Sequence, residues 1–205
     1  RQLLGRWRLL IMTLLASLPV LVTLMTLRSG SAPDVAEFES VVYSAMLLGT
    51  IAPLVVLAIA TGAFGNEVED RTLANLTLAP VPRWQIVIPK LLASISIAAP
   101  FIGISAFVSS YVAFLGDVRA TVAVTIAAIV GVALYSSAFT WLGLVTSQAI
   151  GVGLLYVVLW EGLFSGYVAG VRLLSIRHYS IALMNGLDPR RFAGAAEMSF
   201  AGAVG

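Results

Sequence analysis

Residues 121–145, TVAVTIAAIVGVALYSSAFTWLGLV, decide the fold because this long stretch contains no charged side chain. The hydrocarbon core of a bilayer is ~30 Å thick, and ~20 helical residues cross it. Inside that core the backbone N–H and C=O groups must bond within the protein, and a helix satisfies them within one segment. The stretch therefore predicts a transmembrane helix.

Further apolar runs lie on both sides of this stretch. The run at 149–168 follows after residues 146–148, and the two runs are predicted as separate helices because 121–168 is too long for one crossing. No run shows the alternation of apolar and polar residues that marks the strands of an outer-membrane barrel. The remaining spans are predicted at residues 9–27, 41–63 and 86–115.

The run at 86–115 is longer than one crossing requires, since a helix of that length extends ~45 Å. Either the helix is strongly tilted or its first two turns lie at the membrane surface. Trp84, Pro89 and Lys90 favour the second arrangement, because aromatic and basic residues are common at membrane interfaces. Pro100 predicts a kink in the part that follows.

The composition agrees with a membrane protein. Of the 205 residues, 60% are hydrophobic and 11% are charged, whereas soluble domains are ~45–50% apolar and ~25% charged. The net charge of +2 is too small to indicate binding to nucleic acid. The chain has no cysteine, its only histidine is His178, and it contains neither a GxSxG nor a GxxxxGK[ST] sequence. These absences predict no catalytic residue and no metal site, and any ATP would have to bind to another chain.

The charges around the first span predict its orientation. Arginines 1, 6 and 8 precede it, whereas Arg28 follows it together with three acids. The first span usually dominates topology, so the N-terminus is predicted to be cytoplasmic. The count over the whole chain does not decide the orientation, because it gives six basic residues on each side. In this count Arg177 lies on the outer side. Residues 1–8 form either an interfacial helix on the anionic leaflet or plain flanking charge.

Residues 66–78 are the strongly polar part of the first half of the chain and are then cytoplasmic as well. Asn66 can cap a helix, and Glu67, Glu69 and Asp70 lie in the first turn, where the helix dipole favours acids. Leu73 and Leu76 follow at helical spacing, and Pro80 and Pro82 end the segment. A solvated loop would not need this apolar stripe, so a short surface helix is predicted.

Glu161 is the one acid inside a predicted span, and burying an unpaired carboxylate in a membrane costs several kcal/mol. It is a candidate for a gate, a substrate contact or a proton relay, with Trp160 and Tyr156 beside it. Alternatively, it forms a structural pair with Arg172 or Arg177. On the next turns Gly162, Gly166 and Gly170 form a small-residue face that predicts close helix packing, within the subunit or across a dimer.

The chain is mixed in polarity beyond residue 168, where four arginines prevent a further span. The sequence LDPRR, residues 187–191, predicts a turn that opens a short helix at Pro189.

Residues 67–90 resemble a motif of the ABC-2 type transporter permeases. The motif has an acid-rich start, Thr-Leu, a leucine-rich turn, Pro-x-x-Arg and an apolar run with a lysine. Arg71 stands where the family usually has glycine. Residues 160–179, WEGLFSGYVAGVRLLSIRHY, are similar to the end of the fifth span in some bacterial members. The residues that match the first motif are Glu67, Glu69, Thr72, Leu73, Leu76, Pro80, Arg83, Ile86 and Lys90.

The resemblance implies an all-α, polytopic membrane fold like that of the type V exporters. It implies six spans per subunit, five of them visible here, an N-terminal elbow helix and an extracellular re-entrant hairpin at 170–205. It also implies a dimer with a second permease, homologous or identical, and two ATP-binding cassette subunits that carry the ATP and Mg²⁺. No cofactor is expected on this chain. The segment 66–78 becomes the coupling helix, with Glu67, Glu69, Asp70, Arg71, Thr72, Leu73, Leu76 and Arg83 as candidate ATPase-coupling residues.

The expected function is export of a hydrophobic or amphipathic molecule, such as a drug, a peptide or a lipid, across a prokaryotic inner or plasma membrane. Multidrug efflux is one form of this activity. Two other functions remain open at the level of the sequence. One is a secondary transporter or channel that uses Glu161 as a proton carrier and needs no ATP. The other is a membrane assembly or immunity component that transports nothing.

Overall fold

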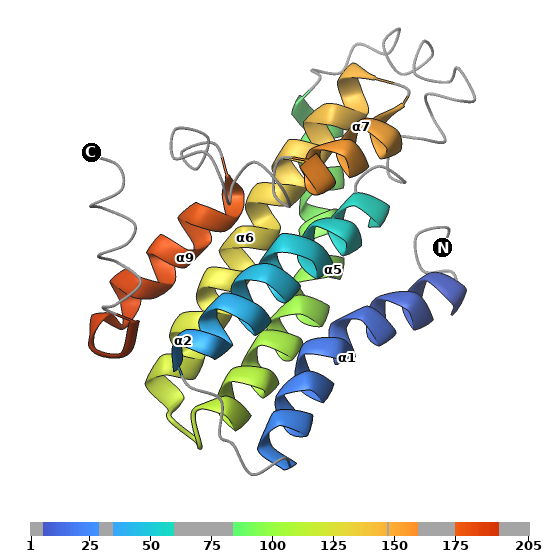
Figure 1. Cartoon of the computed structure of the whole chain (residues 1–205). Coiled ribbons are helices and arrows are strands. Elements are labelled where there is room, and N and C mark those ends of the chain that lie inside the picture. The colour runs from blue at the N-terminus through green and yellow to red at the C-terminus, as the bar shows by residue number, and fades with distance from the viewer. Residues whose placement is uncertain (1–5, 29–34, 60–83, 147, 160–174, 193–205) are drawn as a thin grey trace, which may run out of the picture.

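The computed structural model of this chain describes residues 6–28, 35–59, 84–146, 148–159 and 175–192. These residues are almost entirely helical and contain no strand, which confirms the predicted all-α class. Figure 1 shows the helices as an elongated bundle. The elements are α1 (Arg6–Arg28), α2 (Val35–Glu37), the π-helix η1 (Phe38–Ile51), α5 (Trp84–Ala113), α6 (Val118–Val145), α7 (Ala149–Leu155) and α9 (Ile176–Leu187).

The described part of the chain contains four helices that are long and apolar enough to cross a membrane. They correspond to four of the predicted runs, with the second helix starting at Val35 rather than at 41. The predicted fifth span, 149–168, is described only as far as residue 159, and the predicted elbow helix only from Arg6, where α1 begins. The four helices are Leu9–Arg28, Val35–Ile59, Val87–Ala113 and Val118–Val145.

The second span occupies the centre of the bundle and α1 its edge. In the most apolar 18-residue stretch of each helix, 72% of the second span is buried by the rest of the chain, whereas only 22% of α1 is. Small residues of α6, including Ala127, Ala128 and Gly131, are buried and allow neighbouring helices to come close. α5 packs along α6, α1 packs on α5 and η1, and α9 packs on α6 (Figure 1). The core therefore lies between η1, α5 and α6.

The turn between α5 and α6 is short. Leu115 and Gly116 both have positive φ angles, 53° and 89°, and Gly116 is the residue type that adopts this conformation without strain. Asp117 then caps α6 by accepting the N–H groups of Arg119 and Ala120. α5 includes both Pro89 and Pro100 within one helix of 30 residues, so the predicted third run, 86–115, is helical as far as Ala113 and its last two residues belong to the turn.

The central helix has an unusual hydrogen-bond register. η1 is a π-helix of 14 residues, and within it the Thr50 hydroxyl donates to the carbonyl oxygen of Ala45, five residues earlier, at 3.1 Å. The hydroxyl of Tyr135 on α6 donates to the carbonyl oxygen of Leu48 at 3.1 Å. π-Helices are rare and are found mostly as single turns near functional sites. The elements that contact this long central π-helix are therefore candidates for a functional site.

Candidate functional site at the α9 interface

α9 is a helix of 12 residues, about 18 Å long, and it covers roughly half of a membrane thickness. The hydroxyl of Ser175 caps its start by accepting the N–H of His178 at 3.3 Å. Ser180 lies against Gly131 in the middle of α6, whereas Asp188 follows the end of α9 and pairs with Arg119 at the start of α6. α9 therefore begins at mid-depth in the bundle and ends beside the α5–α6 turn (Figure 1).

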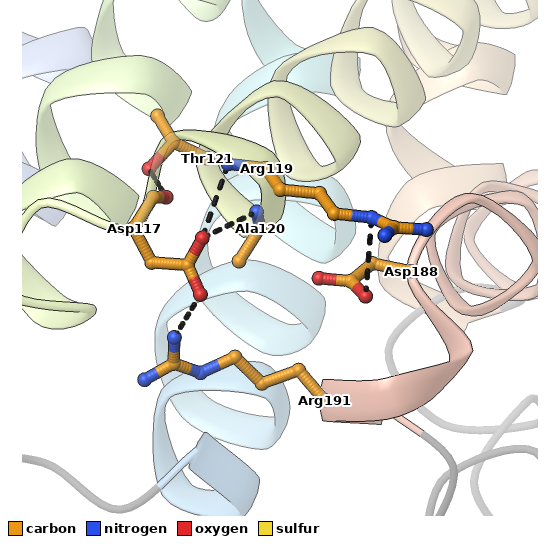
Figure 2. Close-up of polar contacts among 6 residues, drawn as sticks. All are labelled: Asp117, Arg119, Ala120, Thr121, Asp188 and Arg191. Carbon is orange, nitrogen blue, oxygen red and sulfur yellow. Dashed lines mark hydrogen bonds and ion pairs between the residues drawn. The ribbon is translucent and has the colours of Figure 1, made fainter.

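Four charged side chains, here called the end cluster, join the end of α9 to the start of α6: Asp117, Arg119, Asp188 and Arg191 (Figure 2). One Asp117 oxygen accepts the N–H groups of Arg119 and Ala120 at 3.1 and 3.4 Å. The other accepts a hydrogen bond from Nη1 of Arg191. Nε of Arg119 lies 3.7 Å from Oδ1 of Asp188, whose side chain is only 4% exposed. Each arginine thus faces an acid on the other segment, and the cluster has no net charge.

Three aromatic rings lie beneath the end cluster. The guanidinium carbon of Arg191 is 5.0 Å from the centre of the Phe114 ring, a cation–π contact. Phe114 packs edge-on against Phe38 at 4.9 Å and against Phe192 at 5.7 Å. These rings come from η1, the α5–α6 turn and the helical turn at 189–192, and that turn confirms the predicted helix opening at Pro189. Charges and rings together fix the end of α9 to the bundle.

The end cluster gives a prediction for acid conditions. The N–H of Ala120, with the guanidinium of Arg191 and the N–H of Arg119, lowers the pKa of Asp117 from its ordinary value of 3.8, although partial desolvation opposes them. Because the folded pKa is depressed, this stabilisation is complete above pH 3.8 and is lost as the pH falls through the folded pKa. The side chain is 35% exposed, so we expect a contribution of only ~0.2–1 kcal/mol.

Thermal unfolding of the purified protein in detergent, followed from pH 6 down to pH 3, checks this expectation. The Asp117→Asn variant keeps a capping side chain but cannot titrate, so the stability difference between parent and variant should shrink below pH 4. A difference that stays constant across the whole range would contradict the predicted role of the carboxylate.

The first half of α9 contacts η1 and α6 at two glycines. A Cβ placed on Gly131 would lie 2.8 Å from Oγ of Ser180 and 3.1 Å from Cδ2 of Leu48. A Cβ placed on Gly49 would lie 3.0 Å from the Ser44 carbonyl oxygen and 3.3 Å from Nη1 of Arg177. The sequence count had placed Arg177 at the outer surface. The structure corrects this, because α9 starts deep in the bundle and Arg177 lies against Gly49, near the end of η1 and the midpoint of the span Val35–Ile59.

Most of the site residues predicted from the sequence lie outside the described residues. Tyr156 is described, at the end of α7, where its ring lies 6.3 Å from that of Phe139 in an edge-on contact. Phe139 stacks in turn on Tyr135 of α6 at 6.0 Å. Tyr156 is therefore placed against the aromatic side chains of α6. The predicted residues outside the description are Glu67, Glu69, Asp70, Arg71, Thr72, Leu73, Leu76, Arg83, Trp160, Glu161, Gly162, Gly166 and Gly170.

Sequence reasoning missed the end cluster. Asp117 directly before an apolar helix is a recognisable capping signal, so its first role could have been found. Its second role could not, because its partner Arg191 lies 74 residues further along the chain. The buried position of Asp188, which is 3% exposed, has no sequence signal beyond the turn that was predicted there.

The described helices define a polytopic α-helical membrane protein, with four helices long and apolar enough to cross a membrane and the shorter helix α9 packed on α6. The chain matches the family described as ABC-2 family transporter protein over residues 5–178, and it belongs to that family. Membership implies a membrane location and an ATP-binding cassette partner. Searches of curated proteins and of solved structures give no significant match.

Proposed function

We propose that this chain is the permease subunit of an ATP-binding cassette exporter, and that it forms the translocation path together with a second permease, identical or homologous. The family match over residues 5–178 carries this proposal, and the described apolar spans support it. The family implies an ATP-binding cassette partner, and the proposal assigns ATP and Mg²⁺ to two such subunits.

Coupling to those partners is assigned to residues 66–78, on the cytoplasmic side of the cell membrane. Successive spans run in opposite directions, so Arg6, residue 59 and Trp84 lie toward one end of the bundle, and Arg28, Val35 and the α5–α6 turn lie toward the other (Figure 1). The segment that joins 59 to 84 thus starts and finishes at the end where α1 begins. With the N-terminus cytoplasmic, the end cluster faces the outside.

The proposed substrate is a hydrophobic or amphipathic molecule, such as a drug, a peptide or a lipid. The apolar character of the spans supports this choice, since a sugar polymer would need polar groups along its path. Trp160, Glu161 and Tyr156 are the proposed path or gate residues, and Gly162, Gly166 and Gly170 the proposed packing face.

Reconstitution tests the proposal. The permease is purified together with its ATP-binding subunit and inserted into proteoliposomes. Uptake of a panel of dyes, labelled peptides and labelled lipids is then measured. We expect uptake that requires Mg²⁺ and ATP and stops with an ATPase-inactive partner subunit. Uptake driven by a proton gradient without ATP would instead identify a secondary transporter. ATPase activity that no solute stimulates, with no uptake, would identify an assembly component.

A further inference from the structure

Two independent contacts place Arg177 about half-way along the length of the bundle. Its side chain lies against Gly49, near the midpoint of the span Val35–Ile59. Three residues later on the same helix, Ser180 lies against Gly131, near the midpoint of the span Val118–Val145. The guanidinium is therefore at about the depth of the bilayer centre, and it is only partly buried by the chain.

This charge has no neutralising partner among the residues that the structure describes. Arg177 makes no hydrogen bond and no ion pair with them. Their acids all lie near the opposite end of α9: Asp117 and Asp188 in the end cluster, and Glu37 and Glu39 in the first turns of the second span. Arginine stays protonated in proteins and is costly within a membrane, so an unpaired one at this depth points to a function.

The surroundings suit an anion. Gly49 has no side chain, so the guanidinium lies directly against the backbone of η1. A guanidinium presents five N–H donors in a planar fork that matches the two oxygens of a carboxylate or phosphate. The first turn of α9, capped by Ser175, adds the positive end of a helix next to it.

We propose that Arg177 is a specificity-determining residue that binds an anionic group, a carboxylate or a phosphate, of the transported molecule in the middle of the membrane. This inference rests on the proposed transport function and adds to it a substrate class: amphipathic molecules that carry a negative charge. The anionic group of the transported molecule binds Arg177, and the apolar part of the same molecule lies among the apolar helices.

Binding to the nucleotide-free complex tests the inference without any need for ATP. The probes are dansyl undecanoic acid, which is anionic, and its uncharged methyl ester, and the readout is the Kd from dansyl fluorescence. In the Arg177→Gln variant we expect the Kd of the acid to rise about tenfold or more, with the Kd of the ester unchanged. Arg177→Lys keeps the charge but not the fork, and should recover part of the affinity. The matched control is Arg190→Gln, an exposed arginine just after α9, which should change neither Kd.

Three results would overturn the inference. One is an equal change for acid and ester, and another is no change for either. The third is that Arg177→Gln and Glu161→Gln each lower thermal stability while the double variant is no worse than either, with the preference for the acid intact. That pattern would assign Arg177 to an internal ion pair. If the complex prefers the acid through Arg177 but ATP drives no uptake, the anion site stands and the exporter proposal fails.

Discussion

Replacing Leu76 with Asp is expected to abolish co-purification of the ATP-binding subunit and, with it, ATP-driven transport. In the proposed coupling helix, Leu73 and Leu76 share one face and fill an apolar groove of the partner. The aspartate removes an anchor and places a carboxylate in a dry interface, an effect of about 2–4 kcal/mol. In the proposed topology this residue lies outside the lipid, so the spans should fold and insert as in the parent.

Asn75 provides the matched control for this substitution. It lies on the opposite side of the same predicted helix, so Asn75→Asp adds the same charge without touching the apolar stripe. The variant should assemble and transport like the parent. Normal assembly of Leu76→Asp would show that residues 66–78 do not dock the ATPase.

The orientation behind this prediction can be checked separately, because the chain has no cysteine of its own. A single cysteine at position 69, in Glu69→Cys, should react with a membrane-impermeant maleimide only from the cytoplasmic side. Labelling from outside would reverse the assigned topology and remove the coupling role with it.

Replacing Gly131 with Leu is expected to cause a large loss of stability at the contact between α6, α9 and η1. The new side chain would enter a space already limited by Ser180 of α9 and Leu48 of η1, whose nearest atoms lie 2.8 and 3.1 Å from the Cβ position. Overpacking of this kind typically costs about 1–3 kcal/mol. Thermal unfolding in detergent should therefore show a lower midpoint, and α9 should become more accessible to proteases.

The Gly151→Leu variant is the control that separates the effect of crowding from the general effect of losing a glycine. Gly151 lies in α7 with no atom within 4 Å of its Cβ position, so Gly151→Leu should unfold near the parental temperature. Equal losses for the two variants would mean that the contact between α6, α9 and η1 is not tightly packed.

The spans were predictable because the membrane restricts backbone structure to few solutions and long uncharged runs are easily recognised. The boundaries of the spans were less predictable. The second span starts at Val35 rather than 41 because Glu37 and Glu39 continue the helix beyond the apolar part, where their charges interrupt the hydropathy pattern. The π-helical register of η1 has no recognisable sequence pattern, and neither has the hydrogen bond that the hydroxyl of Tyr135, in a distant helix, donates to Leu48.

The site depended on contacts that sequence spacing does not report. Arg177 next to Tyr179 and His178 looks like a charge at a surface, and only the docking of α9 against Gly49 and Gly131 places it deep in the bundle. The end cluster likewise joins residues that are distant in the chain. A local capping signal was present at Asp117, but packing between helices determines which partners its carboxylate has.

The short turn between α5 and α6 has a consequence for biosynthesis. Only residues 114–117 separate the two helices, and they make the most extensive helix contact in the described part of the chain. Such a pair can leave the translocon as one hairpin that already shields its inner faces. α9 is made later and contacts mainly α6, so it can take its place only once that hairpin stands in the bilayer. A chain truncated before residue 175 would therefore contain the α5–α6 hairpin but lack the half-length helix that carries Arg177.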